Sequence, residues 1–326
     1  MPQRRPGQNR LLYEMPAAQL FKPCGNSVFY DKQAAKHPEY TMRTEPPESK
    51  YRITWNIHWN CNFRCSYCFF DGHWQEYARR NVYKTVREWM TYWKRMRDKY
   101  GRIFITITGG EPFIYPDFTE LIRQLSAIHW PINITTNFSR DLQEFVKSVD
   151  YEKVSLSVSF HPQYHQIDSF IGKVKWLRSN KFAGCNNFVA YPPFMSDLQF
   201  YAGKFASIGE NLKVVPFIGK HGGKNYPDGY DDAQKRMMGM KEDWLEHKRH
   251  KGMVCQAGSF SALLTPEGNV VRCGQIGDRH ILGSFFAPDF ELSKEPMPCD
   301  AEFCPCDEWK VMPDEKPSGK TGIWIS

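Results

Sequence analysis

Six short runs of alternating apolar and polar residues recur along the middle of the chain. They predict β-strands over Ile53–Trp59, Ile103–Thr108, Ile132–Asn137, Val154–Phe160, Asn187–Tyr191 and Lys213–Ile218. The stretches between them predict α-helices over residues 82–99, 117–128, 139–149, 168–180 and 195–208. Strands that alternate with helices in this way indicate right-handed βαβ units and a parallel sheet, so the predicted fold class is α/β.

The first four predicted strands have one apolar face, which includes Ile53, Trp55, Ile105 and Leu156, and one polar face. The polar face consists of Thr54, Asn56, His58, Thr106, Thr108, Asn133, Thr135, Asn137, Ser155, Ser157, Ser159 and His161. Parallel strands that are covered by helices on both faces should be apolar throughout. A closed eight-stranded barrel also fills its lumen with apolar residues. We therefore predict a partly closed barrel with helices outside and a polar lumen that binds a ligand.

The segments outside the alternating strands and helices differ in composition. Residues 1–50 are proline-rich and predict an irregular N-terminal extension, which leaves residues 51–220 for the barrel. A glycine-rich loop over 220–229 and a helix over 231–251 are expected to form a linker over 221–251. Residues 252–326 contain a predicted hairpin and many Cys and Pro, and we expect a small domain held by metal rather than by a hydrophobic core.

Composition and charge argue against nucleic-acid-binding, membrane-spanning and secreted classes of protein. The chain has 326 residues and a net charge of +7, which permits an anionic partner without requiring one. No basic block is interleaved with aromatic residues, so we expect no nucleic-acid partner. No apolar run reaches the roughly 18 residues of a membrane span, and no signal peptide is recognisable. We therefore expect a soluble cytoplasmic protein without a membrane partner.

Most of the ten cysteines fall into two separate sets. In a reducing compartment such sets indicate metal binding or catalysis rather than disulfides. The first set consists of Cys61, Cys65 and Cys68, directly after the first predicted strand. Three thiolates within eight residues can bind three corners of an iron–sulfur cube and leave the fourth iron open. A zinc knuckle is the alternative, but it would need a fourth ligand nearby.

The C-x3-C-x2-C loop after the first strand, followed by Gly109-Gly110-Glu111-Pro112 after the second, resembles the radical S-adenosylmethionine (SAM) superfamily. The resemblance covers about residues 51–220 and implies a partial (β/α)6 TIM-like barrel. It also implies a 4Fe–4S cluster on the three cysteines, SAM on the open iron and a reductant such as flavodoxin or ferredoxin. The SAM-binding residues that it implies are Tyr67, Gly109, Gly110, Glu111, Asn137, Ser157 and Ser159. Among these, Glu111 is expected to bind the SAM ammonium and Tyr67 to lie near adenine.

The second set consists of Cys255, Cys273, Cys299, Cys304 and Cys306. Its opening, Cys255 followed by Gly268 and Cys273, resembles the first half of a SPASM/twitch auxiliary-cluster domain. A full SPASM domain has seven cysteines, so five imply the shorter form with one auxiliary 4Fe–4S cluster that serves electron transfer. We expect Cys255, Cys273 and Cys306 as ligands, with Cys299 ahead of Cys304 for the fourth position. A structural zinc site is the alternative.

The resemblance implies an enzyme that reductively cleaves SAM to a 5′-deoxyadenosyl radical, which then abstracts a substrate hydrogen. Related auxiliary-cluster enzymes oxidise, crosslink or epimerise peptides, or act on sugars and aminocyclitols. The sequence does not decide between these substrates, and it assigns no catalytic side chain. A non-catalytic zinc or iron–sulfur scaffold protein is the alternative from another class.

Overall fold

The structure is a computed structural model that describes residues 49–68, 73–240, 251–274, 280–301 and 304. A nine-stranded sheet has the order β12-β11-β10-β1-β2-β3-β4-β5-β6. Its parallel strands are β1 (Tyr51–Asn56), β2 (Ile103–Thr108), β3 (Ile132–Thr136), β4 (Val154–Ser159), β5 (Asn186–Ala190) and β6 (Leu212–Pro216).

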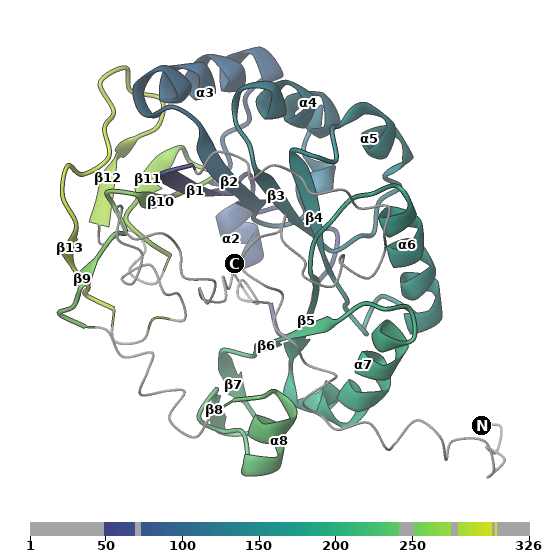
Figure 1. Ribbon diagram of the computed structural model, residues 1–326. Helices are drawn as coiled ribbons and strands as arrows, with labels where there is room; N and C mark the ends of the chain where they lie inside the picture. Colours follow the sequence, from purple (N-terminus) through teal and green to yellow (C-terminus); the bar gives the residue numbers. More distant parts are fainter. Residues whose placement is uncertain (1–48, 69–72, 241–250, 275–279, 302–303, 305–326) are drawn as a thin grey trace, which may run out of the picture.

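Five helices connect these strands in alternation. They are α3 (Val86–Tyr100), α4 (Phe118–Ile128), α5 (Gln143–Ser148), α6 (Ile167–Ser179) and α7 (Leu198–Ala206). The row of strands curves, and the helices lie along its outer side (Figure 1). The predicted α/β partial barrel is therefore confirmed.

The two faces of the sheet differ in the predicted way. Trp55 and its apolar neighbours on the outer face are fully buried in one core beneath the helices, where Trp55 packs on Trp89 and Trp93 of α3. On the inner face the amide of Asn133 donates to the hydroxyls of Ser155 (2.8 Å) and Ser157 (3.0 Å). Because buried polar groups need partners, these lateral bonds allow a polar lumen to be packed.

Two expectations for the linker are corrected. The predicted glycine-rich loop is a hairpin of β7 (Gly219–His221) and β8 (Lys224–Tyr226), because Gly222 and Gly223 adopt the positive φ of a tight turn. The predicted long helix is short within the described residues: α8 spans Asp232–Met237, and Gly239 with φ 67° follows it. Residues 241–250 lie outside the described residues.

The C-terminal segment is not the separate appendage that its composition predicted. β10 (Ser261–Leu264) pairs in parallel with β1, and β11 (Asn269–Val271) and β12 (Ile281–Ser284) extend the same sheet. The predicted hairpin is confirmed by the pairing of β10 with β11. Leu264, Val270 and Phe285 belong to the main hydrophobic core, so burial of apolar surface holds this part in place.

Several short elements complete the described chain. They are α2 (Trp74–Ala78), the 3₁₀ turns η2 (Pro112–Ile114) and η3 (Pro192–Asp197), and the two-stranded pair of β9 (Val254–Cys255) and β13 (Met297–Pro298). Almost all of the predicted N-terminal extension lies outside the described residues.

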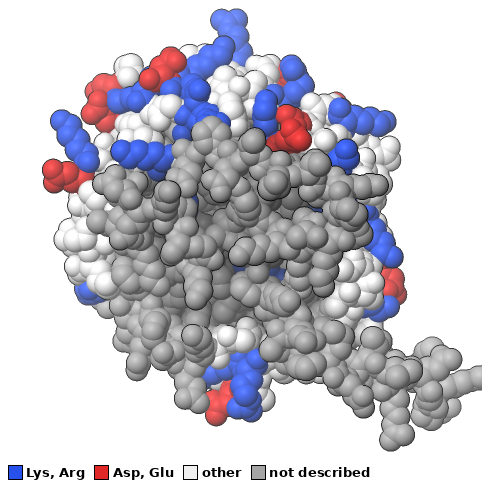
Figure 2. Space-filling view, in the orientation of Figure 1, with Lys and Arg blue, Asp and Glu red and all other residues white. Residues whose placement is uncertain are grey.

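Charged side chains are mixed on the surface. On the face in Figure 2, Lys and Arg gather along the rim formed by α3 and α4, with Asp and Glu among them. The described part of that face therefore presents no continuous basic tract. Among the helices that the structure describes, none has the length and apolar character needed to cross a bilayer.

Candidate functional site

The three cysteines of the first set, Cys61, Cys65 and Cys68, lie in the loop that follows β1 at the carboxyl end of the parallel strands, where α/β folds place their active sites. Cys65 is buried, Cys61 is half-buried and Cys68 is exposed. The backbone N–H of Cys68 donates to the carbonyl of Cys65, which closes the loop into a turn. Because Cys68 is exposed, a group held by the three thiols would reach the open mouth.

Burial and mutual repulsion disfavour the thiolate forms of Cys61 and Cys65. Burial raises the pKa of Cys65 to about 12, and the neighbouring Cys68 and Cys61 raise it further because thiolates repel each other. Burial also raises the pKa of Cys61, which Phe63 N–H (3.4 Å) and the Asn137 amide (3.7 Å) oppose by donating to its sulfur. Positive iron bound to the thiolates would remove this penalty.

A single metal ion fits this geometry poorly. Among the described residues, no three His, Cys, Asp or Glu side chains converge on a position for one ion. Zinc would draw all its thiolates to about 2.3 Å from one point. A 4Fe–4S cluster instead binds each thiolate through a different iron, and the three thiols that line one cavity could supply three of its corners.

The glycines after β2 fix the second motif against this loop. Gly110 N–H donates to His58 O (2.7 Å) and Glu111 N–H to Asn60 O (2.8 Å). A Cβ at Gly110 would overlap the carbonyl of Asn60, and Gly109 has φ 126°. The missing side chains therefore allow the turn to pack directly on the segment that leads into Cys61.

Glu111 is placed differently from the expectation that it binds the SAM ammonium. Its side chain is fully buried, where it accepts hydrogen bonds from Thr136 Oγ1 (2.7 Å), Asn137 N–H (2.6 Å) and Phe113 N–H (3.1 Å). Burial raises its pKa to about 7, although these donors oppose the rise. In this structure the carboxylate joins the turn to the end of β3, and its contact with SAM stays a prediction.

Tyr67 stands between the cysteine loop and β4. Its hydroxyl lies 2.8 Å from Nδ1 of His161, and the two rings stack at 5.8 Å. Nδ1 is also 3.5 Å from Cys65 Sγ. Burial lowers the pKa of His161 to about 3, so its imidazole is neutral, and its tautomer sets which of the two groups donates in this bond. These bonds orient Tyr67 at the mouth of the barrel.

The remaining predicted SAM-binding residues on the inner face differ in how exposed their side chains are. Ser157 is buried and its hydroxyl also accepts from Cys185 N–H (3.3 Å), whereas Ser159 at the end of β4 is half-buried. Asn137 donates from its amide to Asn62 Oδ1 (2.9 Å) as well as toward Cys61. Asn137 therefore contacts the cysteine loop, and Ser159 is better placed than Ser157 to meet a ligand.

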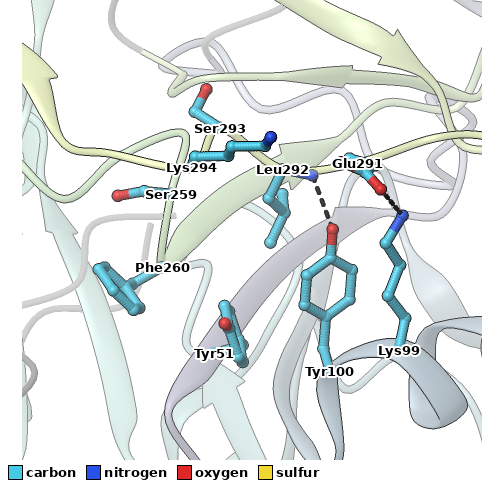
Figure 3. Close-up of a pocket in the computed structure, with 9 residues that line it drawn as sticks. All are labelled: Tyr51, Lys99, Tyr100, Ser259, Phe260, Glu291, Leu292, Ser293 and Lys294. Atoms are coloured by element: carbon cyan, nitrogen blue, oxygen red, sulfur yellow. Dashed lines mark hydrogen bonds and ion pairs between the residues drawn. The ribbon is translucent and has the colours of Figure 1, made fainter.

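A cavity of about 60 Å³ lies at this site, lined by all three thiols, both glycines of the turn, Trp59, Phe63, Arg64 and Trp74. Arg64 stacks on Trp74 with 3.5 Å between guanidinium and ring centre. A larger cavity of about 310 Å³ lies at the opposite end of β1, between Tyr51, Tyr100 of α3 and Phe260 (Figure 3). That end of a parallel barrel serves stability rather than catalysis, so the smaller cavity marks the site.

Three cysteines of the second set lie close together in the structure. Cys255, Cys273 and Cys299 pack in one cluster with Ala257 and Ala301. Cys255 lies opposite Met297 in the β9–β13 pair, and Ala257 N–H donates to its sulfur (3.4 Å). Cys304 is buried, and Cys306 lies outside the described residues. The assignment of ligands in this set stays a prediction.

Sequence reasoning missed several residues of the site. Thr136 and the Arg64–Trp74 pair carried no signal, because their roles depend on contacts across loops. Tyr191 ends a predicted strand, but its bond to His221 Nδ1 (2.9 Å) depends on the β7–β8 hairpin, which the sequence predicts only as a glycine-rich loop. His58 was expected in the lumen, but it is buried beneath the turn and its Nε2 bonds to Glu111 O (2.8 Å).

Comparison with known families agrees with this geometry. Residues 55–166, which include both motifs, match the model of the radical SAM superfamily. This segment is similar to the radical SAM domain. The match runs from the end of β1 through β4 and includes the cysteine loop and the turn after β2, whereas the C-terminal cysteines fall outside it.

Curated relatives match the same kind of domain. They include the GTP 3′,8-cyclase of Haemophilus influenzae strain PittEE, 32% identical over 124 residues, which are 36% of this chain and 36% of that protein. The GTP 3′,8-cyclase of Klebsiella pneumoniae strain 342 is 33% identical over 113 residues, 32% of this chain and 34% of that protein. The chain thus spans about a third of the length of these relatives.

Solved structures share the fold over a larger part of the chain. The enzyme anSMEcpe with bound AdoMet superimposes with a TM-score of 0.55 at 16% identity, over 75% of this chain and 81% of that chain. Streptococcus suis SuiB bound to its precursor peptide SuiA gives 0.52 at 14% identity, over 74% and 63%. At these identities the likeness concerns the fold.

Proposed function

We propose that this protein is a radical SAM enzyme in which Cys61, Cys65 and Cys68 hold a 4Fe–4S cluster. The observation that carries the proposal is the packing of the Gly109-Gly110 turn on the residues before Cys61, which joins the two motifs at one cavity. A bound, reduced cluster would supply the electron for reductive cleavage of SAM, which would yield methionine and a 5′-deoxyadenosyl radical able to abstract a substrate hydrogen. A second cluster on four of the five C-terminal cysteines serves electron transfer.

The chain's own residues perform binding, orientation and exclusion of water. The Asn137 amide and Phe63 N–H stabilise the Cys61 thiolate. Tyr67, held by His161, packs on Tyr191 (5.3 Å) and Phe194 (5.9 Å), and these aromatic rings form one wall of the mouth. An apolar wall beside the cavity limits the water that can quench a reactive intermediate.

The substrate class that we propose is a peptide. Support comes from the neighbour structures that contain peptides, SuiB with SuiA and anSMEcpe with the Kp18Cys peptide, which cover 74% of this chain. GTP is a second candidate, because the relatives that match the radical SAM domain are GTP 3′,8-cyclases. Oxidation, crosslinking and epimerisation are the reactions proposed for a peptide substrate.

The experiment compares SAM cleavage by the reconstituted wild type, Cys65→Ala and Cys185→Ala under a low-potential reductant. We expect 5′-deoxyadenosine from the wild type and from Cys185→Ala, whose thiol lies outside both cysteine sets, but none from Cys65→Ala. Equal cleavage by Cys65→Ala would refute the cluster assignment. A folded wild type that holds iron and never cleaves SAM would instead support the scaffold alternative.

Substrate class is tested by adding GTP or mixed peptides to the same assay. A peptide substrate predicts that peptides raise 5′-deoxyadenosine production and are recovered with a changed mass. Stimulation by GTP alone would reject the peptide and favour cyclase chemistry.

A further inference from the structure

Arg272 is a buried cation beside the C-terminal thiols. It directly precedes Cys273 at the end of β11, and only 2% of the residue is exposed. Its backbone N–H donates to the carbonyl of His280 (2.9 Å), which fixes the start of the side chain. A guanidinium in such a position needs both hydrogen-bond acceptors and a counter-charge.

The acceptors come from the segments that carry the other thiols. Arg272 Nε donates to Ala257 O (2.9 Å), two residues after Cys255. Nη1 donates to Pro298 O (2.6 Å) and Nη2 to Met297 O, directly before Cys299. The planar guanidinium of Arg272 thus connects the β9 segment to the β13 segment, and Cys273 follows Arg272 directly in the chain. We call this guanidinium the fork of Arg272. Because the fork has a fixed geometry, these bonds set the relative positions of three thiols.

The counter-charge among the described residues is weak. The carboxylate of Asp300 lies 3.7 Å from Nη1, is 49% exposed and also pairs with His280 Nε2 at 2.8 Å. The three carbonyls supply dipoles but no net charge. A buried site that combines a cation with neighbouring thiols suits an anionic group, and a cube with four thiolate ligands is anionic and becomes more so on reduction.

We propose that Arg272 is the positioning residue and the buried counter-charge of the auxiliary iron–sulfur cluster. This inference rests on the auxiliary cluster of the proposed function. Its fork arranges the segments of Cys255, Cys273 and Cys299 before the cluster is inserted. Its charge favours the more negative, reduced form of the cluster and so raises the reduction potential.

The potential is measured in protein that also carries Cys61→Ala, Cys65→Ala and Cys68→Ala, so that only the auxiliary cluster contributes. We expect Arg272→Met to shift the midpoint, followed by electron paramagnetic resonance, to a more negative potential. Arg272→Lys keeps the charge and is expected to stay near the parent potential while binding less iron. Arg87→Met, which removes an exposed arginine on α3, is the matched control and should leave both unchanged.

The positioning role has a readout that needs no cluster. In metal-free protein, Arg272→Met should speed hydrogen exchange in residues 254–258 and 297–301, whereas Arg87→Met should not. A full iron complement with an unchanged potential in Arg272→Met would overturn the counter-charge role. Unchanged exchange would overturn the positioning role. If the parent triple variant binds no iron, the auxiliary cluster itself is refuted, and the exchange result still decides what Arg272 does.

Discussion

The side-chain amide of Asn137 donates toward Sγ of Cys61 across 3.7 Å, although 76 positions separate the two residues in the chain. The backbone N–H of the same residue is held at 2.6 Å by Glu111. One residue at the end of β3 therefore connects the turn after β2 to the cysteine loop after β1. Hydrogen bonds of this residue thus connect the two sequence motifs, although it follows a third strand that belongs to neither motif.

Asn137→Leu removes the donor to the Cys61 sulfur and to Asn62. Because donors to a ligating sulfur stabilise the electron-rich cluster, we expect a more negative potential for the first cluster. Losing an outer partner of a metal ligand also costs roughly 10–100-fold in metal affinity or activity. Potentiometry and 5′-deoxyadenosine production measure the two effects. A potential equal to or above that of the wild type would contradict this role.

Glu111 predicts a pH dependence of stability. Its pKa rises from the ordinary 4.5 to about 7 on folding, so the folded state holds a proton that the unfolded state has lost between these values. The contribution of Glu111 to stability is therefore present below pH 4.5 and falls as the pH rises to about 7, by on the order of 3 kcal/mol.

Glu111→Gln removes this titration and places an amide against the N–H of Asn137. We expect a net loss of stability of about 1–3 kcal/mol from the broken hydrogen bond. The penalty should be larger at pH 5 than at pH 8, because the wild type loses its own advantage over that interval. Urea unfolding at both pH values measures it. A penalty that grows with pH would show that the carboxylate is ionised in the folded protein.

Gly110→Ala tests the close packing of the turn. Its Cβ would overlap Asn60 O, so either the turn or the cysteine loop must move, which costs about 1–3 kcal/mol. We expect lower iron content at the first cluster together with lower stability. Gly172→Ala on α6 is the matched control, since nothing lies within 4 Å of its added Cβ, and alanine should stabilise that helix by up to about 1 kcal/mol. Equal behaviour of both variants would refute the packing argument.

Tyr67→Phe keeps the aromatic ring and removes the hydroxyl bound to His161. A buried polar atom left without its hydrogen-bond partner costs about 1–3 kcal/mol, whichever of the two groups donates. Tyr92→Phe is the control, because it removes the same kind of hydroxyl and keeps a ring that packs on Phe285 and Phe286. Thermal unfolding compares the two, and SAM titration follows whether Tyr67 lies near adenine. A stability of Tyr67→Phe equal to that of the control would contradict the Tyr67–His161 bond.

The regular elements of the barrel could be predicted from the sequence. The bounds predicted for the second strand, Ile103–Thr108, are those observed, because its alternation reflects burial of every second side chain. The thiol loop and the glycine turn could also be placed, since both directly follow predicted strands.

Contacts between distant parts could not be predicted. The sequence predicts a hairpin within residues 252–326, but it does not indicate that one strand of this hairpin, β10, pairs with β1. Glu111 is a similar case: its motif indicated a ligand, whereas its burial depends on Thr136, 25 positions away. The fork of Arg272 likewise depends on carbonyls that carry no sequence signal.

The parallel pairing of β10 with β1 has a consequence for any attempt to divide this protein. β1 hydrogen-bonds β2 on one side and β10 on the other, and Ser261 lies opposite Arg52 in that register. A fragment that stops before residue 252 would leave the backbone groups of Tyr51–Asn56 as an open edge, which is a template for aggregation. The strands β1 to β6 and the C-terminal segment are therefore expected to fold, and to remain free of aggregation on expression, only as a single unit.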